Sequence, residues 1–454
     1  MKTKNTLCIA EWQSFSIDEI KEVCDSQEKA QKIFSEFVEF AQQDGNHYFL
    51  KFKNSKTLVA QNYVGIIQTT SGFCLEILPK TFRTKKNSEG FNAYNEQSQE
   101  NEIKKAKEIL LKMLKSLKNA PFKESDFANL KAQNFPLLEI FILMFLEELL
   151  KLIKRGMKAN YITKEENRSF LKGKLLFNEN LKSNFAHKER FFTSSDEFSV
   201  NIAPNRIIKS TLEFLSKQNL SAATSTKLNQ MRFIFSEIDP SQNITKDLSQ
   251  CHNTRTFKHY SILLQWCEIF LRYKTFTLYK GDSKAFALLF DMNKVFEDFV
   301  ASEMKKWCNN THFQEKNPHY KEFIENIDLM ADLHIKTQEK SKYLAQNQKE
   351  KDIFQLKPDI VAYQDSKPHF IADTKWKMLD TQERNFAISQ SDMYQIFAYL
   401  AKYKCTKGFL IYPKIEEMQN KELSLQFEFK PQIAIEDSKN NSTLTILFFP
   451  LNQD

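Results

Sequence analysis

Glycine is scarce in this chain, and its scarcity argues against one class of site. Only 8 glycines occur among 454 residues, and none belongs to a Gly-x-x-x-x-Gly-Lys-Ser/Thr or Gly-x-Gly-x-x-Gly pattern. Those patterns form the glycine-rich turns that hold nucleotide phosphates against a helix amino terminus. We therefore expect this chain to bind no nucleotide, and any nucleotide-driven step to use a site in another chain.

Cysteines and long apolar runs are sparse as well. The 7 cysteines are scattered and never form a Cys-x-x-Cys pair, which argues against zinc and favours a reducing compartment. The longest apolar run, residues 140–146, is about a third of the ~20 residues that a membrane helix needs. The first residues include no apolar stretch long enough for a signal peptide. We expect a cytoplasmic protein without membrane contact.

The excess of positive charge is small. There are 65 Lys and Arg against 57 Asp and Glu, a net charge of +8, which permits contact with nucleic acid but does not establish it. Residues 161–200 contain a local basic group: Lys172, Lys174, Lys182, Lys188 and Arg190. This group is either a solvated surface or a contact for DNA or a partner protein.

A chain of this length is too long for one ordinary core, so we expect a multidomain protein of the α+β class. Sequence patterns divide it into four parts. They are a small β-rich domain at 1–80, a flexible connection at 81–101, a mainly helical region at 102–285, and an α/β domain with a central mixed sheet at 286–454.

Periodicity and end signals predict the individual elements. Helices are expected at 26–43, 103–117, 136–155, 205–216, 224–235, 259–273, 291–307 and 392–403. Strands are expected at 8–15, 47–52, 58–69, 73–78, 331–335, 359–363, 369–376, 408–412, 425–429, 432–435 and 444–449. The charged stretch 339–351 is expected to be a surface insertion.

Two of the predicted strands contain charged residues in apolar surroundings. Burying such charges costs free energy, so their presence suggests a function. One contains Asp359 after a proline, and the next contains Asp373-Thr374-Lys375 among apolar neighbours. Alternate side chains of a strand share a face, so Asp373 and Lys375 point the same way and Thr374 points opposite. A hairpin between the strands would bring Asp359 alongside, so that two carboxylates and one ammonium converge.

Such a cluster suits a hard divalent cation. Two neighbouring carboxylates repel each other, and a cation between them removes that cost; oxygen ligands favour Mg²⁺ or Mn²⁺. The cation can polarise a phosphoryl oxygen and activate water. Lys375 can orient or deprotonate that water, or stabilise charge on the phosphorus centre. The pattern predicts phosphodiester hydrolysis, with a buried structural ion pair as the alternative.

The Asp-x-Lys triplet alone is not specific, because it recurs in polar, turn-like sequence at 282–284, 365–367 and 437–439. Two flanking elements add to the pattern. Glu297 lies in the predicted helix at 291–307, and Gln395 and Tyr399, four residues apart, share one face of a later helix. Each of these is also compatible with ordinary helix surface.

Together these residues resemble the PD-(D/E)xK nucleases that carry a Gln-x-x-x-Tyr motif. More particularly, they are similar to the McrC family, the nuclease subunits of McrBC-type restriction systems. Further matching pieces occur in family order at 62–67, 75–80, 171–175, 197–201, 205–209 and 291–297. The polar stretch 81–101 and the insertion 339–351 contain no motif of the family.

The resemblance implies a PD-(D/E)xK endonuclease domain at 286–454 and assigns roles within it. The implied catalytic residues are Asp359, Asp373 and Lys375, with Glu297, Gln395 and Tyr399 as accessory positions. The implied ligands of Mg²⁺ or Mn²⁺ are Asp359, Asp373 and the backbone carbonyl of Thr374.

The resemblance also implies a partner, an AAA+ GTPase ring of the McrB type that recognises double-stranded DNA and onto which the amino-terminal part docks. Whether the DNA must be methylated stays open. Two alternatives remain: a non-cutting adaptor of a ring NTPase, and a stand-alone DNA repair nuclease of the same fold. The intact acid, acid and lysine set favours cutting, and the long amino-terminal region argues against a stand-alone enzyme.

Overall fold

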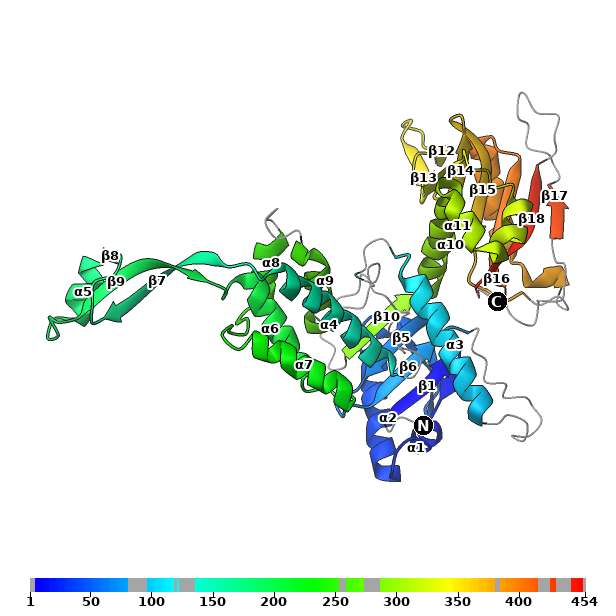
Figure 1. Ribbon diagram of the computed structural model, residues 1–454. Coiled ribbons are helices and arrows are strands. Elements are labelled where there is room, and N and C mark those ends of the chain that lie inside the picture. Colours follow the sequence, from blue (N-terminus) through cyan, green and yellow to red (C-terminus); the bar gives the residue numbers. More distant parts are fainter. Residues whose placement is uncertain are drawn as a thin grey trace.

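The computed structural model describes residues 5–80, 96–117, 121, 135–252, 259–272, 286–379, 384–414, 425–429 and 442–451. Within these residues the fold is of the mixed α+β class, with several separate sheets. Figure 1 shows an elongated molecule in which a hairpin arm projects from a helical middle region, and the two chain ends lie in different parts. None of the described helices combines the length and the apolarity that crossing a membrane requires.

The amino-terminal part consists of short strands and helices. They are β1 (Thr6–Ala10), β2 (Ser14–Phe15), α1 (Ile17–Lys21), α2 (Gln27–Gln42), the 3-10 helix η1 (Asn46–Tyr48), β3 (Leu50–Asn54), β4 (Thr57–Ala60), β5 (Tyr63–Gln68) and β6 (Cys74–Leu78). The helix predicted at 26–43 is confirmed, and Ser26 caps it by accepting from the backbone N–H of Lys29. The strands predicted at 8–15 and 58–69 each divide into two, the first at a turn where Trp12 adopts a φ of 66°.

One sheet crosses a predicted domain boundary. Its order is β1-β6-β5-β10. The sequence predicts that the carboxy-terminal domain begins at residue 286, where β10 (Phe286–Asp291) begins. β10 pairs antiparallel with β5, and at Gly65 an added Cβ would lie 2.0 Å from the carbonyl oxygen of Leu288. Only glycine permits this approach. The pairing joins residues more than 200 positions apart, which local patterns do not show.

The middle region contains the helices α3 (Glu96–Leu114), α4 (Leu137–Arg155), α6 (Ala203–Leu215), α7 (Ala222–Ile234), α8 (Ile244–His252) and α9 (Ser261–Arg272). The helix predicted at 136–155 is confirmed as α4, which is buried on most sides. The flexible connection predicted at 81–101 is wrong for residues 96–101, which begin α3. Its residues 81–95 lie outside the described part of the chain.

The middle region is not only helical, because an arm extends from it. The arm consists of β7 (Asn160–Arg168), β8 (Lys174–Leu175), α5 (Phe177–Ser183) and β9 (Phe191–Ser199), with β9 between β7 and β8. Figure 1 shows it reaching away from the rest of the molecule. Nine consecutive residues of β7 and of β9 pair antiparallel, which accounts for its length.

The carboxy-terminal part contains α10 (Met292–Asn309), α11 (Thr311–Lys316), the 3-10 helix η4 (Pro318–Tyr320), α12 (Lys321–Ile327), β11 (His334–Thr337), β12 (Tyr343–Gln346), β13 (Asp352–Gln355), β14 (Ile360–Gln364), β15 (Lys367–Thr374), the 3-10 helix η5 (Arg384–Ala387), α13 (Gln390–Tyr403), β16 (Lys407–Lys414), β17 (Leu425–Glu428) and β18 (Thr443–Pro450). The insertion predicted at 339–351 forms much of the β12–β13 hairpin. The strand predicted at 432–435 lies outside the described residues.

The central sheet of this part is mixed, as predicted, with the order β11-β14-β15-β16-β18-β17. β14 and β15 form an antiparallel hairpin, whereas β15, β16 and β18 run parallel. Both faces are covered, since Phe370 and Ala372 pack in one cluster with α10 and Ile371 packs in another with α13. Burial on both faces explains why these strands read as continuous apolar runs.

Candidate active site

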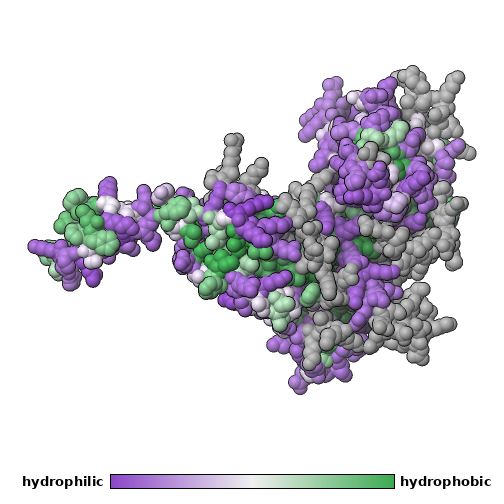
Figure 2. All heavy atoms as spheres, viewed as in Figure 1, coloured by the Kyte–Doolittle hydropathy of each residue, from purple (hydrophilic) through white to green (hydrophobic). Residues whose placement is uncertain are grey.

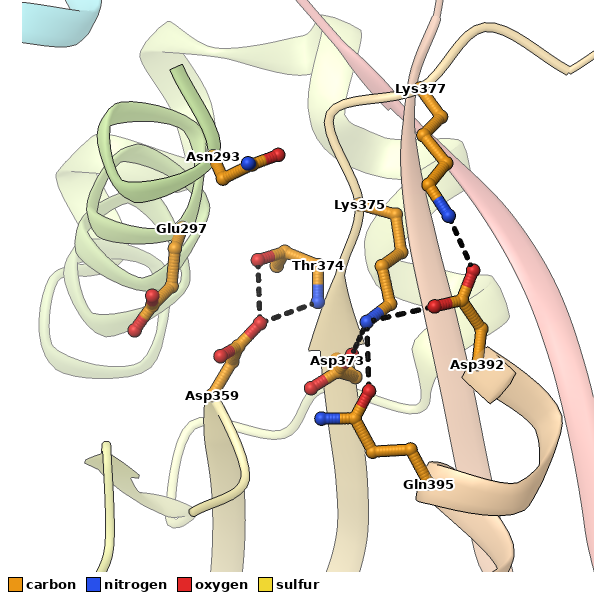
Figure 3. A pocket seen from close by; sticks show the side chains of 9 residues that line it. All are labelled: Asn293, Glu297, Asp359, Asp373, Thr374, Lys375, Lys377, Asp392 and Gln395. Carbon is orange, nitrogen blue, oxygen red and sulfur yellow. Dashed lines mark hydrogen bonds and ion pairs between the residues drawn. The ribbon is translucent and has the colours of Figure 1, made fainter. Parts of the chain in front are cut away.

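A pocket of about 300 Å³ lies where β14 begins and β15 ends. Figure 3 shows its side chains coming from α10, from the two strands and from α13. The lining residues are Asn293, Glu297, Asp359, Asp373, Thr374, Lys375, Lys377, Asp392 and Gln395. The structure thus brings Asp359, Asp373, Lys375, Glu297 and Gln395 to one place, although they span about a hundred positions of the chain.

The side of the pocket next to α10 is built around Asp359. Its Oδ2 accepts from the backbone N–H and from the hydroxyl of Thr374, both at 2.8 Å. The amide of Gln338 donates to Asp359 Oδ1 at 3.2 Å and also to Glu297. Thr374 therefore faces α10, opposite to Asp373, as strand alternation predicts.

The side next to α13 is built around Lys375. Its ammonium lies 2.5 Å from Asp373 Oδ2 and 3.2 Å from Asp392 Oδ1, and it donates to Gln395 Oε1 at 3.0 Å. Gln395 in turn donates to the hydroxyl of Tyr399 at 2.8 Å. Tyr399 does not line the pocket, but its hydroxyl accepts from the amide of Gln395, whose oxygen in turn accepts from Lys375 (Figure 3).

The capping residues that begin α10 and α13 determine which of their side chains line the pocket. Ser389 caps α13 and accepts from the backbone N–H of Asp392; Asp392 and Gln395 are three residues apart and share a face. Asp291 caps α10 by accepting from the backbone N–H of Asn293 at 3.0 Å. Asn293 and Glu297, four residues apart, then point toward the strand ends.

Burial shifts the pKa values of Asp359, Asp373 and Glu297 upward. Burial, together with the charge of Asp359, raises the pKa of Asp373 to about 7. Burial and the charge of Glu297 raise the pKa of Asp359 to about 6. Burial also raises the pKa of Glu297 to about 7. Because these three buried acids lie close together, simultaneous ionisation of all three is unfavourable, and a bound cation would remove that cost.

Lys375 has the opposite environment. Burial by itself lowers the pKa of its ammonium, but the charges of Asp373 and Asp392 outweigh burial and raise that pKa above its usual value. Lys375 is therefore positively charged at neutral pH in this arrangement. Of the roles considered from the sequence, orienting water or stabilising charge on phosphorus fits this state better than removing a proton.

The donor set fits a hard cation that keeps several waters. Among the residues that the structure describes, no group of three or more His, Cys, Asp or Glu side chains is placed to hold a metal ion. Mg²⁺ needs no such group, because it is often held by one or two carboxylates, water and substrate phosphate. Asp359 and Asp373 supply two buried carboxylates, and their raised pKa values show the cost that a cation would remove.

Sequence patterns did not single out four residues of this site: Asn293, Gln338, Lys377 and Asp392. Asp392 had a usable signal, since it stands third after the capping Ser389 and three before Gln395. Lys377 stands two residues after Lys375, and its ammonium lies 2.8 Å from Asp392 Oδ2. Gln338 had no local signal, because it meets Asp359 only through the pairing of β11 with β14.

Asp392 is expected to act as a positioning residue for Lys375. Replacing Asp392 with asparagine removes a charge that holds both Lys375 and Lys377, and should lower the rate of the phosphodiester hydrolysis that the sequence predicts about tenfold, as loss of such a supporting contact commonly does. The measurement is single-turnover cleavage of DNA with Mg²⁺ and the predicted GTPase partner present. The matched control is Asp247→Asn, which removes an equally buried aspartate that pairs with Arg206 in the middle region. If both variants lose the same activity, Asp392 has only a structural role.

Comparisons with known proteins identify the family and bear on the overall fold. The family model described as McrBC 5-methylcytosine restriction system component matches residues 58–413. A structure of Thermococcus gammatolerans McrB AAA+ hexamers with bound McrC contains a chain 18% identical to this one, with a TM-score of 0.62, covering 98% of this chain and 94% of that one. A chain of the Thermococcus gammatolerans McrBC complex is 19% identical, with a TM-score of 0.47, covering 71% and 99%. No curated protein gives a significant match. At such identities the first of these likenesses shows a shared fold.

Proposed function

Because the chain belongs to the family of McrBC 5-methylcytosine restriction system components, we propose that it is the subunit that cuts DNA in such a system. The observation that supports the proposal best is the pocket in which Asp359, Asp373 and Lys375 meet at the end of a two-strand hairpin. Its chemistry is that of metal-assisted phosphodiester hydrolysis.

Each residue has a definable part in that reaction. Asp359 and Asp373, with the carbonyl of Thr374, would hold Mg²⁺ or Mn²⁺, which supplies a polarised phosphoryl oxygen and an acidified water. Lys375 carries the positive charge that stabilises the growing charge on phosphorus. Gln395 and Asp392 fix the ammonium of Lys375, and Tyr399 fixes Gln395. Glu297 orients Gln338 beside Asp359.

The raised pKa of Asp373 predicts how stability depends on pH. A carboxyl with a folded-state pKa near 7 and an unfolded value of about 3.9 holds more protons when folded, so it destabilises the protein as pH rises through this window. In chelator, the Tm of the parent should fall more steeply between pH 5 and 8 than that of Asp373→Asn. Mn²⁺ should raise the parent's Tm more at pH 8 than at pH 5, because metal competes with protons. Equal slopes for the two proteins in chelator would contradict the assignment.

The partner of the proposed reaction is an AAA+ GTPase ring like McrB. The structural relative with a TM-score of 0.62 is described with McrB AAA+ hexamers and bound McrC. This chain has no glycine-rich phosphate-binding pattern, so GTP hydrolysis would fall to the partner. Residues 1–80 are the predicted docking part, and the arm offers a further surface.

The arm exposes apolar side chains that its own fold does not cover. Phe177 and Phe185 are 71% and 83% exposed, and Figure 2 shows a patch of hydrophobic residues near its free end. Part of the positive charge of the arm is neutralised by ion pairs within it, since Lys164, Arg168 and Lys172 all pair with Glu197. An exposed apolar patch with partly neutralised charge suits a protein partner better than DNA.

The alternatives differ in a measurable way. A mixture of the chain, an McrB-like GTPase, GTP, Mg²⁺ and plasmid DNA containing 5-methylcytosine should yield linear DNA. A non-cutting adaptor would stimulate GTP hydrolysis but leave the plasmid intact. A stand-alone nuclease would cut equally well without the GTPase. Unmodified plasmid in a parallel reaction shows whether methylation is required.

A further inference from the structure

Trp376 lies between the candidate site and the amino-terminal part of the chain. It follows Lys375 directly and is 1% exposed. Its ring packs against Phe296 with centroids 5.3 Å apart, and Phe296 is the neighbour of Glu297 in α10. The indole therefore extends from the segment that carries Lys375 and packs against α10, the helix that carries Glu297.

The polar partners of Trp376 come from the amino-terminal part, more than 290 positions earlier. The indole Nε1–H donates to Glu11 Oε1 at 2.5 Å. The ammonium of Lys80 donates to the backbone carbonyl of Trp376 and lies 5.5 Å from the centre of its ring. The segment that carries Lys375 is thus held through its next residue by two side chains of another part of the protein.

The amino-terminal sheet fixes where these two side chains stand. β1 and β6 are parallel neighbours, with Ala10 opposite Leu78. Glu11 and Lys80 follow these two residues, so both lie at the same end of the sheet. The backbone N–H of Glu11 donates to the carbonyl of Leu78, and the backbone N–H of Lys80 donates to Glu11 Oε1, both at 2.9 Å. Both the backbone and the side chain of Glu11 are therefore fixed by hydrogen bonds to the amino-terminal part, in addition to the contact with Trp376.

The burial of Glu11 calls for an explanation. The residue is 3% exposed, and its Oε2 has no hydrogen-bond partner within the described part of the chain. A buried carboxylate is costly unless its contacts compensate. Among the described residues, the side chain that donates to Glu11 is the indole of Trp376, the residue that follows Lys375.

A second contact joins the same two parts. The amide of Asn62 donates to Asp291 Oδ1 at 3.2 Å, and Asp291 caps α10 through Asn293, which lines the pocket. The amino-terminal part therefore contacts the start of α10 as well as the end of β15. Both elements contribute side chains to the pocket.

We propose that Glu11 is a positioning residue for the cutting reaction: by holding Trp376 it fixes the backbone from which Lys375 reaches Asp373 and Gln395. The proposal rests on the proposed function. It predicts that breaking the contact between Glu11 and Trp376 slows the chemical step without weakening DNA binding, because the ammonium moves while the DNA-binding surface stays. A merely structural role would change stability and leave kcat unaltered.

The test uses the full chain with an McrB-like GTPase, GTP, Mg²⁺ and 5-methylcytosine plasmid. Glu11→Leu should lower kcat by about tenfold to a hundredfold, the size expected for a small misplacement of a reacting group, with KM for DNA unchanged. Glu11→Gln, whose amide oxygen still accepts from the indole, should recover most of that loss. The matched controls are Glu76→Leu and Glu76→Gln, which alter a buried carboxylate of the amino-terminal sheet that pairs with Lys107. These controls should lower Tm and leave kcat unchanged.

A double variant separates this contact from others. Trp376→Phe keeps the ring contact with Phe296 but removes the N–H donor, so it should lower kcat as Glu11→Leu does. The two changes together should cost no more than one, since both break the same contact. Losses that add fully, or a folded Glu11→Leu variant with the parent's kcat, would overturn the proposal.

A readout without cutting keeps the proposal separate from the proposed function. Acylation of Lys375 by a water-soluble ester, followed by mass spectrometry, reports how well its ammonium is held. Acylation should be faster in Glu11→Leu than in the parent and unchanged in Glu76→Leu. If the parent cuts no DNA, the proposed function fails, and the acylation rates alone still decide whether Glu11 positions Lys375.

Discussion

Replacing Asp373 with asparagine is expected to lower the rate of DNA cleavage by about a thousandfold or more, which corresponds to roughly 4 kcal/mol of lost transition-state stabilisation. The change keeps the shape of the side chain but removes a charged metal ligand. It also removes the carboxylate that lies 2.5 Å from the ammonium of Lys375. The measurement is single-turnover cleavage with Mg²⁺ and the GTPase partner present.

The controls for this result test the competing explanation, a structural ion pair. Asp365→Asn alters the same Asp-x-Lys pattern at an exposed turn and should cut DNA like the parent. In chelator, Asp373→Asn should melt no lower than the parent, because burial raises the pKa of this carboxyl to about 7 and so makes its charge unfavourable. A variant that melts well below the parent and still cuts would favour the ion pair.

A second large effect is expected from the partner. The purified chain alone should bind and hydrolyse neither GTP nor ATP, and it should cut DNA efficiently only when a ring-forming GTPase is added. The reason is the lack of any glycine-rich phosphate-binding pattern among its 8 glycines. The measurements are GTP hydrolysis and plasmid cleavage by each protein alone and by the mixture.

Substitutions on the arm locate the docking surface within the same experiment. Phe185→Ser should weaken stimulation of the partner, because it removes an apolar side chain that is 83% exposed. Phe233→Ser, at a 79% exposed site outside the arm, is the matched control and should not. Deleting residues 1–80 is a poor test, since β10 would lose its pairing with β5 and Trp376 would lose Glu11. Hydrolysis of GTP by this chain alone would overturn the two-subunit account.

Local signals predicted several elements of the fold, including those that carry the site. α4 and α13 could be placed because their apolar spacing and end residues lie within the helix itself, such as Gly156 after α4. The hairpin of β14 and β15 could be placed because both strands are apolar and joined by a short polar turn. The spacing within β15 then put Asp373 and Lys375 on one face, where the structure has them paired.

What could not be predicted depends on contacts between distant residues. β10 joins the amino-terminal sheet because β5 offers it an edge and Gly65 permits the close approach. Gln338 reaches Asp359 only after β11 has paired with β14. The link from Glu11 to Trp376 spans 365 positions. None of these contacts produces a periodic pattern in the sequence, so they cannot be predicted from the spacing of residues.

The most direct test of the central claim is the metal dependence of cutting by the intact site. Plasmid cleavage by the chain with its GTPase partner and GTP is measured in chelator, in Mg²⁺ and in Mn²⁺, for the parent and for Asp359→Ala combined with Asp373→Ala. The account predicts cut DNA only for the parent and only with a divalent metal. Because chelator also removes the Mg²⁺ that GTP hydrolysis needs, cleavage by the double variant at full GTPase activity is the result that would contradict it.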